Sequence, residues 1–160
     1  MSLQLVEENL VRQNKALLLL LTLLEEEFSR LQKGEPQRVA QIELSIQELM
    51  RQIASERLSL RRHVDKVVPG AQMVAHTFAA ISGEERTTLE KLLAMMDESE
   101  QRCARQASKN GTMAKALFDQ SNKLLTFMHN QIKPKNTNAY AASGKFAQAR
   151  SDARLLNGRL

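Results

Sequence analysis

The sequence predicts an all-α protein with three long helices in an antiparallel bundle or elongated coiled coil, followed by a flexible basic C-terminal tail. Three observations predict this class. The 160 residues include no Trp, one Tyr and five Phe, so the aromatic residues that favour strands are scarce. Only three Pro and six Gly are present, which indicates few turns. The apolar residues, mostly Leu, Ala, Ile, Val and Met, recur at helical spacing.

The first helix is predicted to begin near Ser2, a possible cap, and to end at Gly34. Within it, residues 16–24 form a nine-residue apolar run. That length is far short of the roughly 20 residues that cross a bilayer, and acidic residues follow instead of a cleavage site. With neither an export signal nor a disulfide framework, the chain is expected to be cytoplasmic. The apolar seam of this helix consists of Leu3, Val6, Leu10, Leu17, Leu20, Leu24 and Leu31.

A tight hairpin is predicted at Gly34-Glu35-Pro36, because Gly suits the left-handed position after a helix and Pro suits the first turn of the next. The second helix should then run to Pro69-Gly70, where Pro ends or kinks it. Its seam consists of Val39, Ile42, Ile46, Leu49, Ile53, Leu60 and Val64.

The third helix is predicted to start at a capping box, in which Ser82 and Glu85 bond to each other's backbone amides. It should continue to about Ile132, with a bend or fraying at Asn110-Gly111 because a Gly inside a helix costs about 1 kcal/mol relative to Ala. Its seam consists of Leu89, Leu92, Met96, Cys103, Met113, Leu117, Leu124 and Met128.

Charge divides the chain into a helical bundle domain, residues 1–132, and a basic tail, residues 133–160. Six Lys and Arg stand against Asp152 in the tail, and they account for the whole net charge of +5. The tail has no sustained apolar seam, so we expect it to be disordered alone, with a short helix over 146–156 when bound. A neutral helical body with a cationic tail is typical of an interaction protein with two binding surfaces.

Few residues suggest catalysis. The three His are too far apart for a local metal motif, and no phosphate-binding loop or nucleophile elbow is present. Glu25, Glu26 and Glu27 spread over a wide arc, so we expect a solvated face with an ion pair to Arg30. Cys103 is expected to be a buried structural thiol. We therefore predict no enzyme, no cofactor and no metal site.

The second half of the third helix is apolar on more than one side. A wide stripe packed against two partner helices explains this as core. A Met-rich apolar surface that accepts amphipathic partner helices explains it equally well. Both interpretations stay open from the residues alone. The tail also has several interpretations: contact with nucleic acid, contact with an anionic membrane, a peptide-like handle for another protein, or a merely solubilising segment.

A resemblance to a known family narrows these alternatives. The chain resembles FlgN-type flagellar export chaperones through its length, its three-helix order, an Asn-punctuated third helix and the following residues: Leu23-Leu24-Glu-Glu-Glu-Phe28, Leu31, Gly34-Glu35, Val39, Ile42, Leu49, Arg57 and the late Tyr140-Ala-Ala-Ser-Gly144. Members keep flagellar hook-associated proteins, which form the hook-filament junction, unassembled and deliver them to the export gate.

The resemblance implies two sites and two partners. An export-gate contact is expected around Tyr140 and Gly144, with the cytoplasmic domain of the gate membrane protein. The tail departs from the family pattern by running on for 16 residues beyond Gly144. The helical termini of hook-associated proteins are expected to bind the third helix at Leu117, Phe118, Leu124, Leu125, Met128 and Ile132.

Other function classes remain as alternatives. One is a helical regulatory protein whose basic tail binds nucleic acid, and another is a helical enzyme subunit. The two main hypotheses differ in salt dependence, since phosphate binding weakens steeply with ionic strength and apolar helix binding does not. An exposed apolar seam would also give a weak homodimer.

Overall fold

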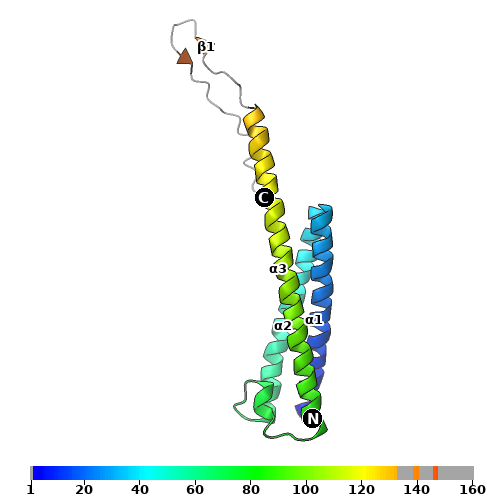
Figure 1. The fold of residues 1–160 in the computed structure, drawn as a ribbon. Helices are drawn as coiled ribbons and strands as arrows, with labels where there is room; N and C mark the ends of the chain where they lie inside the picture. The colour runs from blue at the N-terminus through cyan, green and yellow to red at the C-terminus, as the bar shows by residue number, and fades with distance from the viewer. Residues whose placement is uncertain (1, 133–138, 141–145, 148–160) are drawn as a thin grey trace. The chain divides into compact units, whose positions relative to one another are not determined.

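A computed structural model describes residues 2–132, 139–140 and 146–147. It contains three long helices, as the sequence predicts (Figure 1). The chain forms two compact units, Met1–Lys115 and Ala116–Leu160, and the third helix contributes residues to both.

Helices α1 (Ser2–Lys33) and α2 (Pro36–Val67) form a hairpin and lie side by side (Figure 1). Gly34 has a φ of 68°, and its amide donates to the Leu31 carbonyl at 3.2 Å. The Glu35 amide closes the turn on the Arg30 carbonyl at 3.1 Å. Pro36 then opens α2, where the missing N–H costs nothing because the first amides of a helix lack partners. The predicted hairpin is confirmed.

Two apolar clusters form the core of the first unit. Most of their members come from the predicted seams, as the 3.6-residue periodicity predicts, whereas Leu21, Ala71 and Val74 lie outside those seams. The cluster toward the hairpin turn consists of Leu17, Leu20, Leu21, Leu24, Ile46, Leu49, Ile53 and Cys103. The cluster at the other end consists of Val6, Leu10, Val64, Ala71, Val74 and Leu89.

Helix α3 (Glu84–Ile132) is held to α1 by polar side chains that bond backbone carbonyls across the helix interface. Asn14 of α1 donates to the Leu92 carbonyl at 3.1 Å. The Cys103 thiol donates to the Leu17 carbonyl at 3.4 Å, and this side chain is buried as predicted. The contacts advance together along both helices, so the first part of α3 runs parallel to α1 and antiparallel to α2.

The connection between α2 and α3 contributes to the core and contains a short 3₁₀ helix, η1 (Val74–Thr77). The predicted capping box is wrong. Among the hydrogen bonds of the described residues, none joins Ser82 to Glu85. Instead Gly83, with a φ of 69°, turns the chain, and its carbonyl accepts from the Thr87 amide at 3.3 Å. Helix α3 nevertheless begins at Glu84, close to the predicted start.

Two further expectations, fraying of α3 at Asn110-Gly111 and a solvated face at Glu27, fail for a shared reason. Helix α3 is continuous through Asn110-Gly111, where the sequence predicts a bend or fraying. Asn110 is buried and donates to the Leu24 carbonyl at 2.8 Å and to Glu27 at 2.7 Å. Glu27 is likewise buried and not part of a solvated face, although the predicted ion pair of Arg30 does form, with Glu26. Each polar side chain satisfies the other, so neither disrupts its helix.

Beyond α3, the structure describes two two-residue strands, β1 (Ala139–Tyr140) and β2 (Phe146–Ala147). They pair antiparallel, with Tyr140 opposite Phe146. The sequence predicts no strand there, and a helix over 146–156 only in a complex. The predicted flexibility of the tail concerns residues mostly outside the described ones, and the boundary predicted after residue 132 stays a prediction.

Candidate functional site on the third helix

One face of α3 changes from buried to exposed along its length. Residues seven apart lie on nearly the same side of a helix, and such a series runs through the whole of α3. Leu89 is 1% exposed and Asn110 is 4% exposed. Leu117 is half-buried, and Leu124 is 58% exposed. The face that builds the core in the first unit is therefore open to solvent in the second.

The three helices also differ in length. Helices α1 and α2 have 32 residues each, whereas α3 has 49, so α3 is 17 residues longer than the hairpin helices. A helix rises about 1.5 Å per residue, so the excess amounts to roughly 25 Å of helix. Residues 116–132, described as part of the second unit, have this length.

All but one of the residues predicted to bind a client are exposed. Leu117 is half-buried; the exposed ones are Phe118, Leu124, Leu125, Met128 and Ile132. At 100° per residue, the six side chains fall within an arc of about 120° on α3. The structure brings them together on one face. Exposed apolar side chains gathered on one face mark an interaction site more often than isolated ones do.

Phe127 is a further exposed aromatic residue of this segment, outside the predicted set, and 60% of it is accessible. Its angular position lies about 120° from the centre of the face formed by the other six. It therefore breaks the seven-residue pattern and provides a matched control for the face. The periodicity of the sequence is the signal that separates it from the others.

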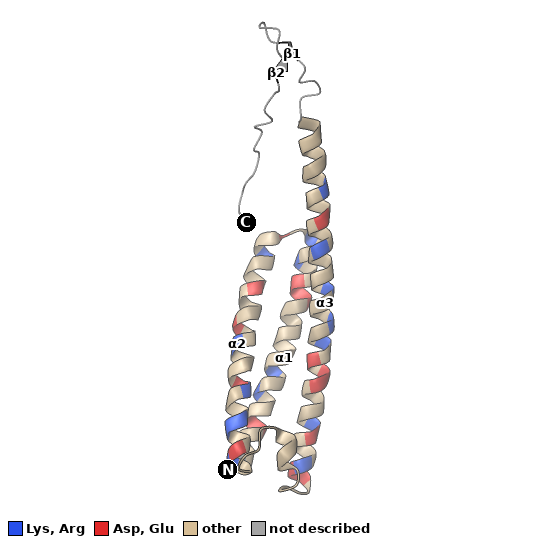
Figure 2. Ribbon diagram, turned by 90° about the vertical axis from the view of Figure 1, so that its left-hand side faces the viewer, with Lys and Arg blue, Asp and Glu red and all other residues tan. Residues whose placement is uncertain are grey.

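The charges of the described helices do not gather into one patch. Lys and Arg alternate with Asp and Glu along α1, α2 and α3 (Figure 2). Several form ion pairs along or between helices, such as Arg12 with Glu56 at 3.1 Å and Arg86 with Glu90 at 2.9 Å. A phosphate backbone is bound by clustered cations, so these mixed surfaces do not favour nucleic acid.

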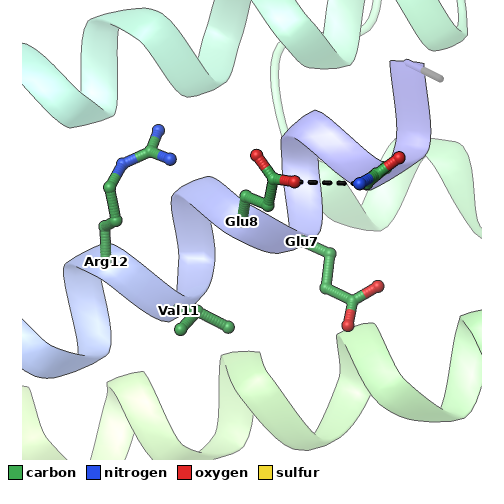
Figure 3. A pocket seen from close by; sticks show the side chains of 5 residues that line it. Glu7, Glu8, Val11 and Arg12 are labelled. Carbon is green, nitrogen blue, oxygen red and sulfur yellow. Dashed lines mark hydrogen bonds between the residues drawn. The ribbon is translucent and has the colours of Figure 1, made fainter.

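The hollows of the first unit offer little chemistry. One of about 520 Å³ is lined by α1 alone, and Figure 3 shows Glu7 and Arg12 pointing to opposite sides of that helix. Its Gln4 donates to Glu8 at 3.0 Å. Another hollow lies between α1 and α2 beside the exposed Leu19 and Leu44. Among the described residues, no group of three His, Cys, Asp or Glu side chains could hold a metal ion.

The buried cysteine is not poised as a nucleophile. Burial raises the pKa of the Cys103 thiol, which disfavours the thiolate needed for attack. The thiol also has a structural role, since it donates to the Leu17 carbonyl.

None of the described helices combines the length and the apolar character that a bilayer span requires.

The decisive comparison is with protein families. The model of the FlgN protein family matches residues 1–148. This chain belongs to the FlgN family. The match includes all three long helices and reaches past Tyr140 and Gly144. No curated protein and no solved structure matches the chain.

Membership of the FlgN family indicates the class of function. FlgN proteins are flagellar export chaperones, which act by binding and are not enzymes. As a family they bind flagellar hook-associated proteins. The client-binding residues predicted on α3 stay a prediction. Of the predicted gate-binding residues, Tyr140 has its backbone in β1, and Gly144 lies outside the described residues.

Proposed function

We propose that this FlgN-family chaperone is cytoplasmic, binds the helical termini of flagellar hook-associated proteins on α3, prevents their premature assembly and delivers them to the export gate. The client face consists of Leu117, Phe118, Leu124, Leu125, Met128 and Ile132. One observation carries the proposal. The seven-residue series that is buried at Leu89 and Asn110 is half-buried at Leu117 and exposed at Leu124, among the other exposed apolar side chains of the client face.

The client face is exposed, whereas the first half of α3 has buried side chains that pack against the hairpin. Within residues 84–115, α3 buries Leu89, Ser99, Cys103 and Asn110, and Cys103 and Asn110 bond to backbone carbonyls of α1. An amphipathic client helix would cover residues 117–132 in the same manner, by inserting apolar side chains into the spaces between those of α3. The apolar surface of the client would then be hidden from its own assembly partners. No nucleotide or metal enters this mechanism.

Leu124→Asp tests the client face. The substitution places an uncompensated charge in the contact, so we expect at least about 100-fold weaker binding of a C-terminal helical segment of a hook-associated protein. Titration calorimetry with the full chain measures it, and circular dichroism checks that the helices persist. Phe127→Asp is the matched control, because it puts the same charge on the same helix away from the face. Equal loss in both variants, or loss of helicity in Leu124→Asp, would remove the proposed client site.

We also propose that the tail docks on the cytoplasmic domain of the export gate, with Tyr140 as its anchor, Gly144 as a turn and the Lys and Arg residues as salt-sensitive attraction. Tyr140→Ala should leave helical content and client affinity unchanged but weaken docking of the client-loaded chaperone. Truncation after Lys133 should weaken it further. Surface-based binding to the purified gate domain measures both variants. Docking of Tyr140→Ala as tight as that of the intact chain would remove Tyr140 as the anchor.

The same surface-based measurement, with DNA in place of the gate domain, tests the nucleic-acid alternative. If the tail binds DNA tightly at physiological salt, with affinity that falls steeply as salt rises, the chain acts as a regulator and not only as a chaperone. The client face is expected to behave differently, because apolar contacts depend little on salt. In the absence of client, the exposed face should give weak self-association, which the client segment displaces.

A further inference from the structure

The client face of α3 has a symmetric spacing. Five of its apolar residues, together with the exposed Ser121 at its centre, follow one another at steps of four, three, one, three and four residues. The same steps are met when the helix is followed in either direction. In chain order these residues are Leu117, Ser121, Leu124, Leu125, Met128 and Ile132. The midpoint of the pattern lies between Leu124 and Leu125.

A symmetric spacing allows two copies of one helix to pair with each other. A twofold axis perpendicular to the helices makes them antiparallel, and each contact between two different residues then occurs twice. With the axis at the midpoint, Leu117 lies beside Ile132 of the second copy. The short side chain of Ser121 lies beside the long one of Met128 of the second copy, and a small residue facing a large one packs without a void.

The middle of such a pair consists of leucines. Leu124 and Leu125 are about 100° apart around α3, so they lie on opposite flanks of the client face. The twofold rotation keeps each flank on its own side, which brings Leu124 beside Leu124 of the second copy and Leu125 beside its own equivalent. Phe118 lies on the Leu125 flank, at nearly the height of Ile132 of the second copy. All six residues of the client face therefore gain an apolar or small neighbour.

Charge does not oppose this pairing. Asp119 and Lys123 are the only Asp, Glu, Lys or Arg residues in the segment 116–132. Both lie about 160° from the centre of the client face, so they are on the opposite side of the helix. Two client faces therefore meet without bringing like charges together, and without burying a charge that lacks a partner.

The size of the face sets the strength of the pairing. Phe118 is 65% exposed and Ile132 is 55% exposed, so both have apolar surface left to bury. Residues 117–132 are roughly 24 Å of helix, and a strip of that length along one helix is well below the roughly 800 Å² per partner of a stable interface. The pair is therefore expected to be weak and reversible.

We propose that the free chaperone covers its client face with that of a second copy, in an antiparallel pair whose twofold axis passes between Leu124 and Leu125. The inference rests on the proposed client face and adds the geometry of self-pairing. Because the same side chains serve both contacts, client binding and self-pairing exclude each other. Self-pairing then keeps the apolar face of the free chain from unspecific contacts, and a client helix replaces the second copy.

Thiol crosslinking of the full chain tests the antiparallel geometry. Cys103→Ser first removes the native thiol, and each variant then carries one new Cys and is treated with a short bifunctional thiol reagent. Leu124→Cys should crosslink to itself, because it lies next to the axis. Leu117→Cys and Ile132→Cys should stay uncrosslinked alone, since equal positions at the ends are roughly 22 Å apart along the pair. Mixed together, these two should crosslink at least about tenfold more than either alone.

Phe127→Cys is the matched control for crosslinking. Phe127 is 60% exposed but lies about 120° from the centre of the client face, so this variant should stay uncrosslinked. An excess of a C-terminal helical segment of a hook-associated protein should abolish crosslinking of Leu124→Cys. Sedimentation of the wild-type chain should show a monomer–dimer equilibrium with a Kd on the order of 100 μM, which Leu124→Asp removes and Phe127→Asp keeps.

Two results would overturn the antiparallel pair. One is self-crosslinking of Leu117→Cys as strong as that of Leu124→Cys, because only a parallel pair brings the ends together. The other is a chain that stays monomeric up to about 1 mM. If that monomer still bound client on residues 117–132, self-pairing would fail and the proposed function would stand. A register-specific pair that the client segment does not dissociate would overturn mutual exclusion and the proposed client site with it.

Discussion

The two parts of α3 share a sequence pattern but differ in environment. In residues 84–115 the seven-residue series is buried against α1 and fastened by buried polar side chains such as Asn110. In residues 116–132 the series continues through Leu117 and Leu124, and its side chains are largely open to solvent. Helical periodicity thus identifies the apolar face of a helix, but it does not say which part of that face is buried.

The comparison predicts opposite responses to the same substitution. Leu89→Asp buries a charge among apolar side chains and should lower the free energy of unfolding by at least about 4 kcal/mol, enough to unfold the bundle. Leu124→Asp should change it by less than about 0.5 kcal/mol, because the aspartate stays in water. Urea unfolding followed by circular dichroism measures both. Comparable destabilisation by the two variants would show that Leu124 belongs to the core, and the distinction between the two parts would fail.

A second contrast concerns two asparagines of the same helix. Asn110→Ala removes three hydrogen bonds and leaves Glu27 and the Leu24 carbonyl without this donor, so we expect a loss of about 2–3 kcal/mol. Asn130→Ala, at an exposed position, should change stability by less than about 0.5 kcal/mol. Thermal and urea unfolding are suitable measurements. If Asn110→Ala were neutral, Asn110 would not be an anchor of the first part of α3.

The pH dependence of stability sharpens the comparison further, because Glu43 of α2 lies in the first unit, where a hydrogen bond to Glu27, burial and repulsion from the Glu27 charge raise its pKa to about 7. The pKa of Glu43 is raised in the folded chain, so the native state holds a proton that the unfolded state has lost. This contribution is present below about pH 4.5 and is lost as the pH rises through about 7. The free energy of unfolding should therefore fall from pH 5 to pH 8, by less than the full shift implies, because Glu43 is partly exposed and water screens its interactions. Urea titrations of wild type and Glu43→Gln measure it, and a variant with the same pH slope as wild type would contradict the assignment.

Much of the fold could be predicted from local chemistry. The hairpin at Gly34-Glu35-Pro36 follows from backbone preferences that act within three residues. The capping box at Ser82 failed, because Gly83 provides an equally local solution with a positive φ. The roles of Asn110 and Glu27 could not be predicted, since each is unfavourable alone and is stabilised only by a partner more than 80 residues away.

The sequence was enough to predict which residues of α3 are apolar and share a face, but not whether that face is exposed. The sequence identified the apolar residues around Leu124 and left open whether they form core or groove. Their exposure is a property of the folded chain that periodicity along one helix does not give. The gate-binding residues Tyr140 and Gly144 stay predictions, because they rest on the family resemblance.

Hydrogen exchange of the full chain, with and without a C-terminal helical segment of a hook-associated protein, tests the central claim most directly. The free chain should exchange quickly over residues 117–132 and slowly over 89–110, because residues 89–110 contain the buried side chains that pack against the hairpin. Adding the client segment should slow exchange over 117–132 and leave 89–110 unchanged. If the client instead protected the α1–α2 hollow beside Leu19 and Leu44, with no change over 117–132, the exposed part of α3 would not be the client site.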